Sequence, residues 1–323
     1  MIFPSLARLG LGVGLDLPWD GTTGLAFEAE RGDVLSRPLR RFLVAHAGDW
    51  SHAFFSWQPR DRAPARLEDY AGAWDDLVGA LPAGLPCALH HTALNLGGLA
   101  PYPRARLFDF TNVLCDRYRL RWINEDVGMW SLAGRPVPYP LPPLLNAEGL
   151  SAAIRNVREC QAALSVPLVL EFPGFAEGVS LVLGSSDAYD YFRALAEETD
   201  APVTLDLGHL LSWQWWRGRR GAALLADLER LPLRHCFEIH LSGCEISGDR
   251  FIDAHHGQLL PEQLVLLDRL LPMCPNLRAV TFEDPRFDDH GALLPSNVPS
   301  WRALRERMKS WNRPTTTELA APA

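Results

Sequence analysis

The sequence lacks the paired cysteines of a disulfide framework or of a zinc-binding CxxC motif. Six cysteines stand singly along 323 residues: Cys87, Cys115, Cys160, Cys236, Cys244 and Cys274. A chain of this length can bury a sizeable core without cross-links, so we expect most of them to be buried thiols.

Excess positive charge and long apolar runs are also missing. The chain has 31 Lys and Arg against 39 Asp and Glu, a net charge of −8, and this gives no basic field for nucleic acid. Apolar runs such as residues 236–241 are far shorter than the roughly 20 residues of a membrane span. The first residues lack the charged lead and cleavage site of a signal peptide. We therefore expect no nucleic-acid or membrane partner and a cytoplasmic protein.

Several catalytic motifs are absent too. No GxGxxG follows the first predicted strand, where Gly10, Gly12 and Gly14 instead alternate. A GxSxG elbow and a phosphate-binding loop with Lys are missing, which argues against a serine hydrolase and a P-loop enzyme. A cysteine nucleophile at Cys244 stays open, although a small buried residue is the more common role.

Short β-rich runs alternate with longer segments of helical periodicity, which is typical of a parallel sheet with helical crossovers. The predicted strands are residues 11–15, 42–45, 87–90, 122–125, 168–171, 203–206, 237–241 and 279–283. The predicted helices are residues 67–81, 104–118, 147–164, 188–199, 221–231 and 261–271, with caps at Asn146 and at Ser186–Asp187.

Eight such strands in a chain of this size predict a (β/α)8 TIM barrel, with a doubly wound open sheet as the alternative. The first crossover, residues 19–40, is poorly periodic. We expect one metal-binding domain over residues 1–312 and a disordered tail over residues 313–323.

Metal-ligand residue types follow nearly every predicted strand. They are His46 and Asp49, His90 and His91, Glu125 and Asp126, Glu171, Asp206 and His209, His240, Asp253 with His255 and His256, and Glu283 with Asp284. A single residue of this kind is more often a hydrogen-bonded core or surface residue than a ligand. Strand ends meet at one mouth of a barrel, however, and shared ligation offsets the desolvation of so many charges. Carboxylate and imidazole without thiolate suit iron or manganese better than structural zinc.

The order and spacing of these motifs resemble the multinuclear non-haem iron-dependent oxidative enzymes over residues 10–310. The matching segments are Gly12-Val-Gly-Leu15, Leu89-His90, Leu94-Asn-Leu-Gly97, Asn124-Glu125, Asn156-Val-Arg-Glu-Cys-Gln161, Leu170-Glu171, Leu205-Asp206-Leu-Gly-His209, Ile239-His-Leu-Ser-Gly243, Ile252-Asp-Ala-His255 and Phe282-Glu283. The family includes the oxazolone- and thioamide-forming enzyme of methanobactin biosynthesis and the enzyme that removes a cysteine β-carbon on the route to 3-thiaglutamate.

The resemblance implies a xylose-isomerase-like barrel holding two or three iron ions of mixed Fe(II)/Fe(III) valence, with dioxygen as co-substrate. It implies oxidation of a residue, usually Cys, in a ribosomally synthesised precursor peptide, often with a separate leader-binding protein. The family's metal ligands correspond to His90, Glu125, Glu171, Asp206, His209, His240, Asp253, His255 and Glu283.

The sequence departs from the family pattern at Gly48-Asp49-Trp50, at Asn124-Glu125-Asp126 and at Glu171-Phe172. Asp49 and Asp126, with His91 and His256, are candidate catalytic partners outside the ligand set; the alternative is that they are solvated loop residues.

The segment after His209 is rich in Trp and Arg. Trp213, Trp215, Trp216 and Arg217 have the composition of an interaction hot spot and would suit an acidic leader peptide. Alternatively, the Trp side chains pack beneath a helix and the Arg side chains are solvated.

Two other classes stay open. A divalent-metal sugar isomerase or an abasic-site endonuclease shares the barrel and the Asp-x-Gly-His element, although the acidic charge disfavours the endonuclease. A non-catalytic peptide-binding partner of the same fold is the third class.

Overall fold

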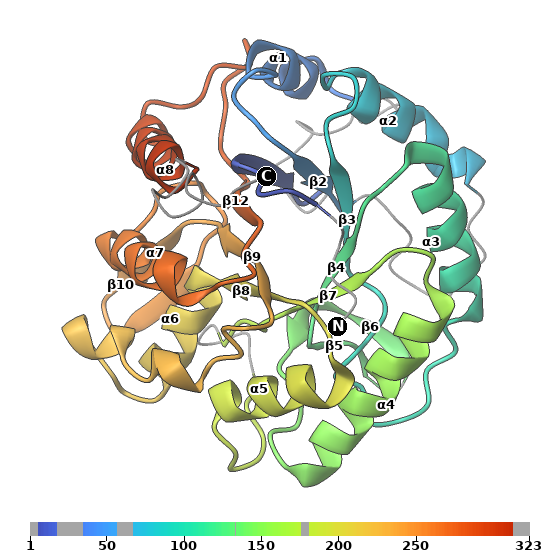
Figure 1. The fold of residues 1–323 in the computed structure, drawn as a ribbon, viewed down its shortest axis with the longest axis vertical. Coiled ribbons are helices and arrows are strands. Elements are labelled where there is room, and N and C mark those ends of the chain that lie inside the picture. The colour runs from blue at the N-terminus through green and yellow to red at the C-terminus, as the bar shows by residue number, and fades with distance from the viewer. Residues whose placement is uncertain (1–5, 18–34, 57–66, 133, 176–180, 313–323) are drawn as a thin grey trace, which may run out of the picture.

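A computed structural model describes residues 6–17, 35–56, 67–132, 134–175 and 181–312, and in them eight strands close into a parallel barrel (Figure 1). The barrel strands are β1 (Leu11–Leu15), β2 (Ala53–Phe55), β3 (Cys87–His91), β4 (Ile123–Asp126), β7 (Leu168–Glu171), β8 (Val203–Asp206), β9 (Cys236–Leu241) and β12 (Ala279–Glu283). β1 pairs with both β2 and β12, which completes the ring. The predicted TIM barrel is confirmed.

Helices form a ring around the strands in Figure 1. They are α1 (Arg37–Ala45), α2 (Glu68–Gly79), α3 (Ala105–Tyr118), α4 (Ala147–Ala163), α5 (Ala188–Thr199), α6 (Leu207–Trp216), α7 (Pro261–Met273) and α8 (Val298–Trp311). Two predicted caps are confirmed: Asn146 accepts from the Gly149 amide at 2.8 Å, and Asp187 accepts from the Tyr189 amide at 3.0 Å.

The strand predicted over residues 42–45 is wrong, because these residues end helix α1. Ser36 caps that helix, and Leu39, Phe42 and Leu43 are buried along one face at helical spacing. The second barrel strand is instead β2, whose three residues are too few to show a strand period.

The α-helix predicted over residues 221–231 is also wrong. The segment forms two short 3-10 helices, η1 (Gly221–Leu225) and η2 (Leu228–Arg230). Between them Ala226 is extended and Asp227 is left-handed with φ 63°, so the helical hydrogen bonds cannot continue.

Two hairpins stand at the end of the barrel where the strands end. β5 (Met129–Leu132) and β6 (Arg135–Leu141) pair after β4, and β10 (Cys244–Ser247) and β11 (Arg250–Asp253) pair after β9. Both hairpins therefore add walls to the mouth, which is the functional end of this fold.

The two glycines of β1 make room inside the barrel for the ring of Phe54 on β2 and for the ring of His52, which directly precedes β2. A Cβ on Gly12 would lie 2.1 Å from His52 Nε2, and one on Gly14 would lie 2.1 Å from the Phe54 ring. Gly12 and Gly14 therefore leave room for packing in the barrel interior.

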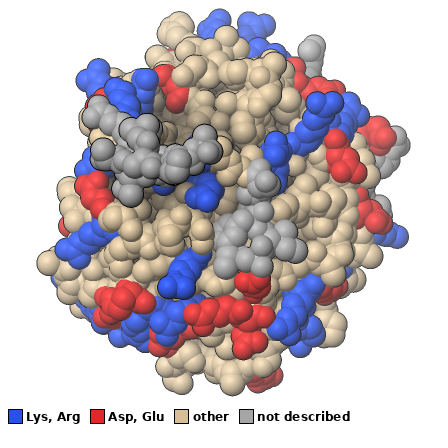
Figure 2. Space-filling model, in the orientation of Figure 1, with Lys and Arg blue, Asp and Glu red and all other residues tan. Residues whose placement is uncertain are grey.

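All six cysteines are buried and unpaired, as expected. No helix in the described ranges is long and apolar enough to cross a membrane. On the face shown in Figure 2, Lys and Arg side chains are interspersed with Asp and Glu and do not form one basic field. Part of residues 19–40 and the whole predicted tail, residues 313–323, lie outside the described residues.

Candidate metal centre

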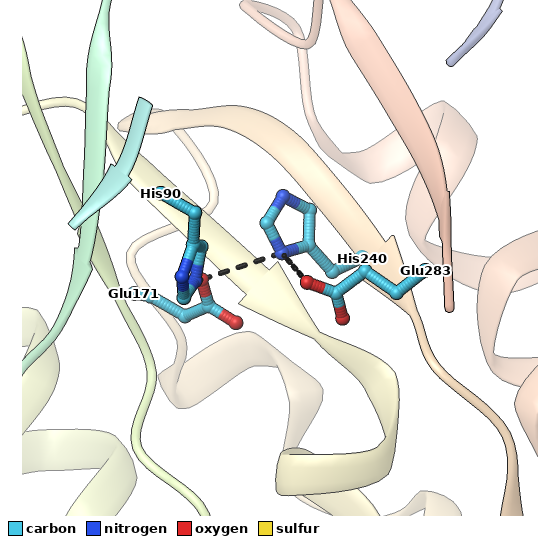
Figure 3. A group of neighbouring side chains, drawn as sticks. All are labelled: His90, Glu171, His240 and Glu283. Carbon is cyan, nitrogen blue, oxygen red and sulfur yellow. Dashed lines mark hydrogen bonds and ion pairs between the residues drawn. The ribbon is translucent and has the colours of Figure 1, made fainter. Parts of the chain in front are cut away.

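Four side chains from four barrel strands converge at the mouth. His90, Glu171, His240 and Glu283 point toward one another in Figure 3, with one candidate ligand atom from each inside a mutual distance of 4.8 Å. Glu171 Oε2 lies 3.0 Å from His90 Nε2 and 3.3 Å from His240 Nδ1. His240 Nδ1 is also 3.2 Å from Glu283 Oε1. Two imidazoles and two carboxylates in this geometry could hold a divalent transition metal.

A second group lies on the neighbouring elements. Asp253 Oδ2 is 3.1 Å from His209 Nε2 and 3.4 Å from His255 Nε2. His209 Nδ1 is 2.7 Å from the carbonyl oxygen of Phe172. A neutral His209 therefore donates from Nδ1 to that carbonyl and keeps the Nε2 lone pair for a ligand.

Further groups link the first two. Asp126, Glu171 and His209 form one, and Asp16, His255 and Asp284 form another. Because Glu171, His209 and His255 each belong to two groups, the groups are linked into one candidate multinuclear centre.

Asp16 was not predicted as a ligand, and Asp284 was named only among the metal-ligand residue types that follow the strands. Asp284 Oδ2 is 2.9 Å from His255 Nδ1, and Asp16 Oδ1 is 3.5 Å from His90 Nδ1. His255 and Asp284 hold positive φ angles of 44° and 43°, which non-glycine residues rarely adopt. Asp16 directly follows β1 and Asp284 directly follows β12, and this position after a strand was the sign of a ligand in the sequence.

Orphaned polar atoms gather at the same place. Five buried atoms here have no hydrogen-bond partner: Asp16 Oδ1, His90 Nδ1, Asp126 Oδ1, Asp206 Oδ2 and His240 Nδ1. Buried nitrogen and oxygen atoms are nearly always paired, so this set fits the donor atoms of a cation site.

The electrostatics agree with a cation site. Burial alone would lower the pKa of His240, but Glu171, Glu283 and Glu238 raise it well above its usual value. Burial raises the pKa of Glu283 to about 7, against the opposing effect of His240. Burial likewise raises the pKa of Asp126 well above its usual range, and Glu171 adds to the shift. Protons therefore occupy positions that a metal ion would take when bound.

A cavity of about 380 Å³ opens over these groups. Six carboxylates and three imidazoles line it, together with Trp130, Tyr139 and Pro140 of the β5–β6 hairpin. The Tyr139 hydroxyl donates to Asp253 Oδ2 at 3.3 Å. The volume suits a side chain or a short peptide segment beside the metal groups.

The structure corrects the predicted ligand Glu125. Its side chain leaves the barrel on the outer face, where Oε2 is 3.0 Å from His91 Nδ1 and Oε1 accepts from the Asn95 amide at 3.1 Å. Neighbouring strand residues face opposite sides, so Asp126 takes the inward position on β4. Asp126, predicted as a catalytic partner, lies within a candidate ligand group.

Asp206 occupies a different position from the other predicted ligands. Its Oδ1 accepts from the His209 amide at 2.7 Å and so caps α6, which fixes the start of the helix that carries His209. Its Oδ2 has no partner, and Asp206 stays a predicted ligand through that atom.

Asp49 lies away from the centre. It follows α1 and precedes β2, at the end of the barrel where the strands begin. Its carboxylate is 2.9 Å from His46 Nδ1 and 3.0 Å from Arg305 Nη1. The predicted catalytic role of Asp49 is corrected to a local ion pair, because the assumed strand before it is helix α1.

The Trp- and Arg-rich segment also lies off the cavity. Trp213 and Trp215 are buried, whereas Trp216 is 49% exposed and stacks on Trp213 with ring centroids 5.1 Å apart. Arg217 Nη1 is 2.9 Å from Asp187 Oδ2. Two of the predicted substrate-binding residues, Trp213 and Trp215, thus belong to the core. Trp216 and Arg217 remain the accessible residues of the predicted peptide-binding surface.

The fold and the site together define a TIM barrel with a candidate multinuclear metal centre. Residues 63–298 match the family described as RiPP precursor modification enzyme MbnB/TglH/ChrH, where RiPP denotes a ribosomally synthesised and post-translationally modified peptide. The chain belongs to this family, which is the family of multinuclear iron-dependent enzymes that its motifs resemble.

Relatives extend over most of the chain. A UPF0276 protein of Paraburkholderia phytofirmans is 25% identical over 261 residues, which cover 78% of this chain and 79% of that protein. A UPF0276 protein of Neisseria meningitidis serogroup B is 25% identical over 211 residues, covering 64% of this chain and 73% of its own.

Solved structures show the fold. A xylose isomerase-like TIM barrel protein from Mycobacterium smegmatis in complex with magnesium has a TM-score of 0.50 and 13% identity, and the match covers 95% of this chain and all of that one. The catalytic domain of a β-amylase from Paenibacillus polymyxa has a TM-score of 0.50 and 7% identity, with 94% and 100% covered. The xylose-isomerase-like architecture predicted above is confirmed.

Proposed function

We propose that this chain uses two or three iron ions and dioxygen to oxidise a residue, a cysteine, in a ribosomally synthesised precursor peptide. The observation that carries the proposal is the set of linked carboxylate and imidazole groups at the mouth of a chain that belongs to this family. The shared residues Glu171, His209 and His255 keep neighbouring groups close enough for several ions to act on one substrate.

The donor set supports iron. Oxygen and imidazole donors in open groups suit redox-active iron, whereas structural zinc prefers closed tetrahedral sites that are rich in thiolate. Cys244 Sγ is 3.8 Å from Asp253 Oδ1. In the metal-free chain, burial raises the pKa of Cys244 well above its usual value and Asp253 adds to the shift. The proposal assigns the sulfur ligand to the substrate.

Iron, when bound, supplies one-electron chemistry with dioxygen and lowers the pKa of a coordinated thiol. The chain's own residues hold and shield the site. The Phe172 carbonyl orients His209, Asp206 fixes the start of α6, and Trp130 and Tyr139 wall the cavity against water. Glu171 bridges two imidazoles and so keeps the first group compact.

The proposal includes a separate leader-binding protein and action in the cytoplasm. The first is an expectation that the family resemblance carries, and the second is the expectation stated above from the sequence.

The test is dioxygen uptake by the protein purified without air, with and without a cysteine-bearing precursor peptide encoded beside its gene. We expect uptake only with the peptide, with a mass change confined to the Cys residue and absent in a Cys→Ser peptide. Turnover of a sugar with manganese or magnesium and no dioxygen uptake would replace the proposal by a divalent-metal isomerase. Peptide binding without stoichiometric metal would replace it by a non-catalytic partner.

A further inference from the structure

A buried carboxylate lies inside the barrel, beside the candidate ligand group of His90, Glu171, His240 and Glu283. It belongs to none of the candidate ligand groups described above. Glu238 is fully buried on β9, and His240 stands two residues further along the same strand. Alternate strand residues face the same side, so both side chains point into the barrel, with His240 nearer the mouth. An unpaired buried carboxylate would be costly, which makes its partners informative.

Glu238 has three donors around it. Trp122 Nε1 donates to Oε2 at 2.9 Å, and Thr281 Oγ1 donates to Oε1 at 2.5 Å. His240 Nε2 lies 3.3 Å from the same Oε1. His52 Nε2 is 3.6 Å from that oxygen.

The direction of these hydrogen bonds follows from the contacts of Glu238: the Trp122 N–H can only donate, and the Thr281 hydroxyl donates to the other carboxylate oxygen. The Thr281 hydroxyl donates its proton to the hydrogen bond with Glu238, so the Thr281 oxygen accepts from His52 Nε2 at 2.8 Å. His52 Nδ1 is then free to accept from the Ser51 hydroxyl at 3.0 Å. The chain of donors is thus consistent from Ser51 to Glu238.

The two nitrogens of His240 face different surroundings. Nδ1 faces Glu171 and Glu283 and has no hydrogen-bond partner. Nε2 lies 3.3 Å from Glu238 Oε1 and 3.3 Å from Asn124 Nδ2, which also donates to Glu171 Oε2 at 2.7 Å. Metal-bound histidines commonly donate their second ring N–H to a carboxylate, which fixes the tautomer and the ring orientation.

We propose that Glu238, which Trp122 and Thr281 hold in place, is the positioning residue of His240. Glu238 accepts a hydrogen bond from the Nε2–H of His240, which leaves the Nδ1 lone pair for the metal ion. This inference rests on the proposed function in one respect, that His240 binds a metal ion. It assigns no contact between Glu238 and the metal or the substrate.

The chain offers a matched control on the outer face of the barrel. Thr111 Oγ1 is 3.1 Å from His91 Nε2, and His91 Nδ1 is 3.0 Å from Glu125 Oε2. This buried Thr–His–Glu chain has the same residue types as the inner one and contains no member of the candidate ligand groups. Thr111→Val therefore reports what the loss of a buried hydroxyl does by itself.

The experiment measures the affinity of the full-length chain for Co(II) by chelator competition, with the melting temperature of the metal-free chain as the second readout. We expect Glu238→Gln to weaken Co(II) binding about 10- to 100-fold and to change the visible spectrum of the bound Co(II). Thr281→Val should weaken binding less, because Trp122 still holds Glu238. Thr111→Val should leave the affinity unchanged.

Wild-type affinity in both Glu238→Gln and Thr281→Val would overturn the inference, and so would a lower melting temperature with unchanged affinity. Nitrogen-15 spectra of the wild-type chain loaded with diamagnetic Zn(II) test it without any variant at Glu238, using His240→Gln to assign the signal. We expect a metal-bound Nδ1 and a protonated Nε2; a metal-bound Nε2 would overturn the inference. Failure of the wild-type chain to bind any metal would instead contradict the proposed function.

Discussion

Glu125 and Asp126 are neighbours on β4, yet their carboxylates lie on opposite faces of the barrel wall. Glu125 is 3.0 Å from His91 Nδ1 on the outer face, and Asp126 groups with Glu171 and His209 on the inner face. The strand period of two residues therefore decides which of two adjacent acids can reach a metal.

Substitution of these two acids should separate metal binding from stability. We expect Asp126→Asn to lower the metal content and affinity of the purified chain, because it removes a carboxylate from a candidate ligand group. Glu125→Gln should keep the metal and lower stability by about 1.5–3 kcal/mol, since it weakens charge-assisted hydrogen bonds to His91 and to the Asn95 amide. Metal analysis and thermal unfolding measure the two effects. Metal loss in Glu125→Gln with full metal in Asp126→Asn would contradict the assignment.

Metal affinity should rise with pH. In the metal-free chain burial raises the pKa of Glu283 to about 7. Burial alone would lower the pKa of His90, but Asp16 and Glu171 raise it to about 10. Both groups must lose a proton to bind a metal, so affinity should fall below pH 7 and keep rising above it. Titration of the chain with Co(II) in weak buffer, followed by a pH indicator, should show proton release at pH 7. Binding that is independent of pH between 6 and 8.5 would rule out these groups as ligands.

Gly12 should tolerate no side chain. Because an added Cβ would lie 2.1 Å from His52 Nε2, Gly12→Ala should displace the imidazole and cost about 1–3 kcal/mol or more. Gly48→Ala is the matched control, since a Cβ there meets nothing within 4 Å. Urea unfolding of both variants gives the comparison, and equal midpoints would show that the close approach of β1 to His52 is not as described.

Trp216 tests the predicted peptide surface outside the cavity. Its ring is 49% exposed on α6, so Trp216→Ala should weaken binding of the precursor peptide about tenfold and leave the metal content unchanged. Val113→Ala, an exposed apolar residue on α3, is the control. Equal peptide affinity in the two variants would show that Trp216 does not bind the precursor peptide.

The barrel and most of the site can be predicted from the sequence because both depend on short, strongly patterned segments. Seven of the strands predicted from apolar runs overlap barrel strands, and His90, Glu171, His240 and Glu283 converge as expected from strand ends. The strand period also explains the main error at Glu125, where a one-residue shift turns a side chain from the inner to the outer face.

Other features depend on tertiary contacts that a single sequence does not display. α6 is apolar nearly all round because it is buried on most sides, so its sequence shows no amphipathic period. Asp16 and Asp284 join the centre only because the residues directly after β1 and β12 lie beside His255. Glu238 looked like an ordinary residue of a buried strand, and only the barrel brings it to Trp122 and Thr281.

Elemental analysis and Mössbauer spectroscopy of iron-57 count and identify the metal ions in the full-length chain purified without air. We predict two or more irons per chain, coupled to one another, with at least one lost in Glu171→Gln because that carboxylate belongs to two of the groups. A chain that binds no stoichiometric metal, or that keeps its full iron content in Glu171→Gln, would contradict this prediction.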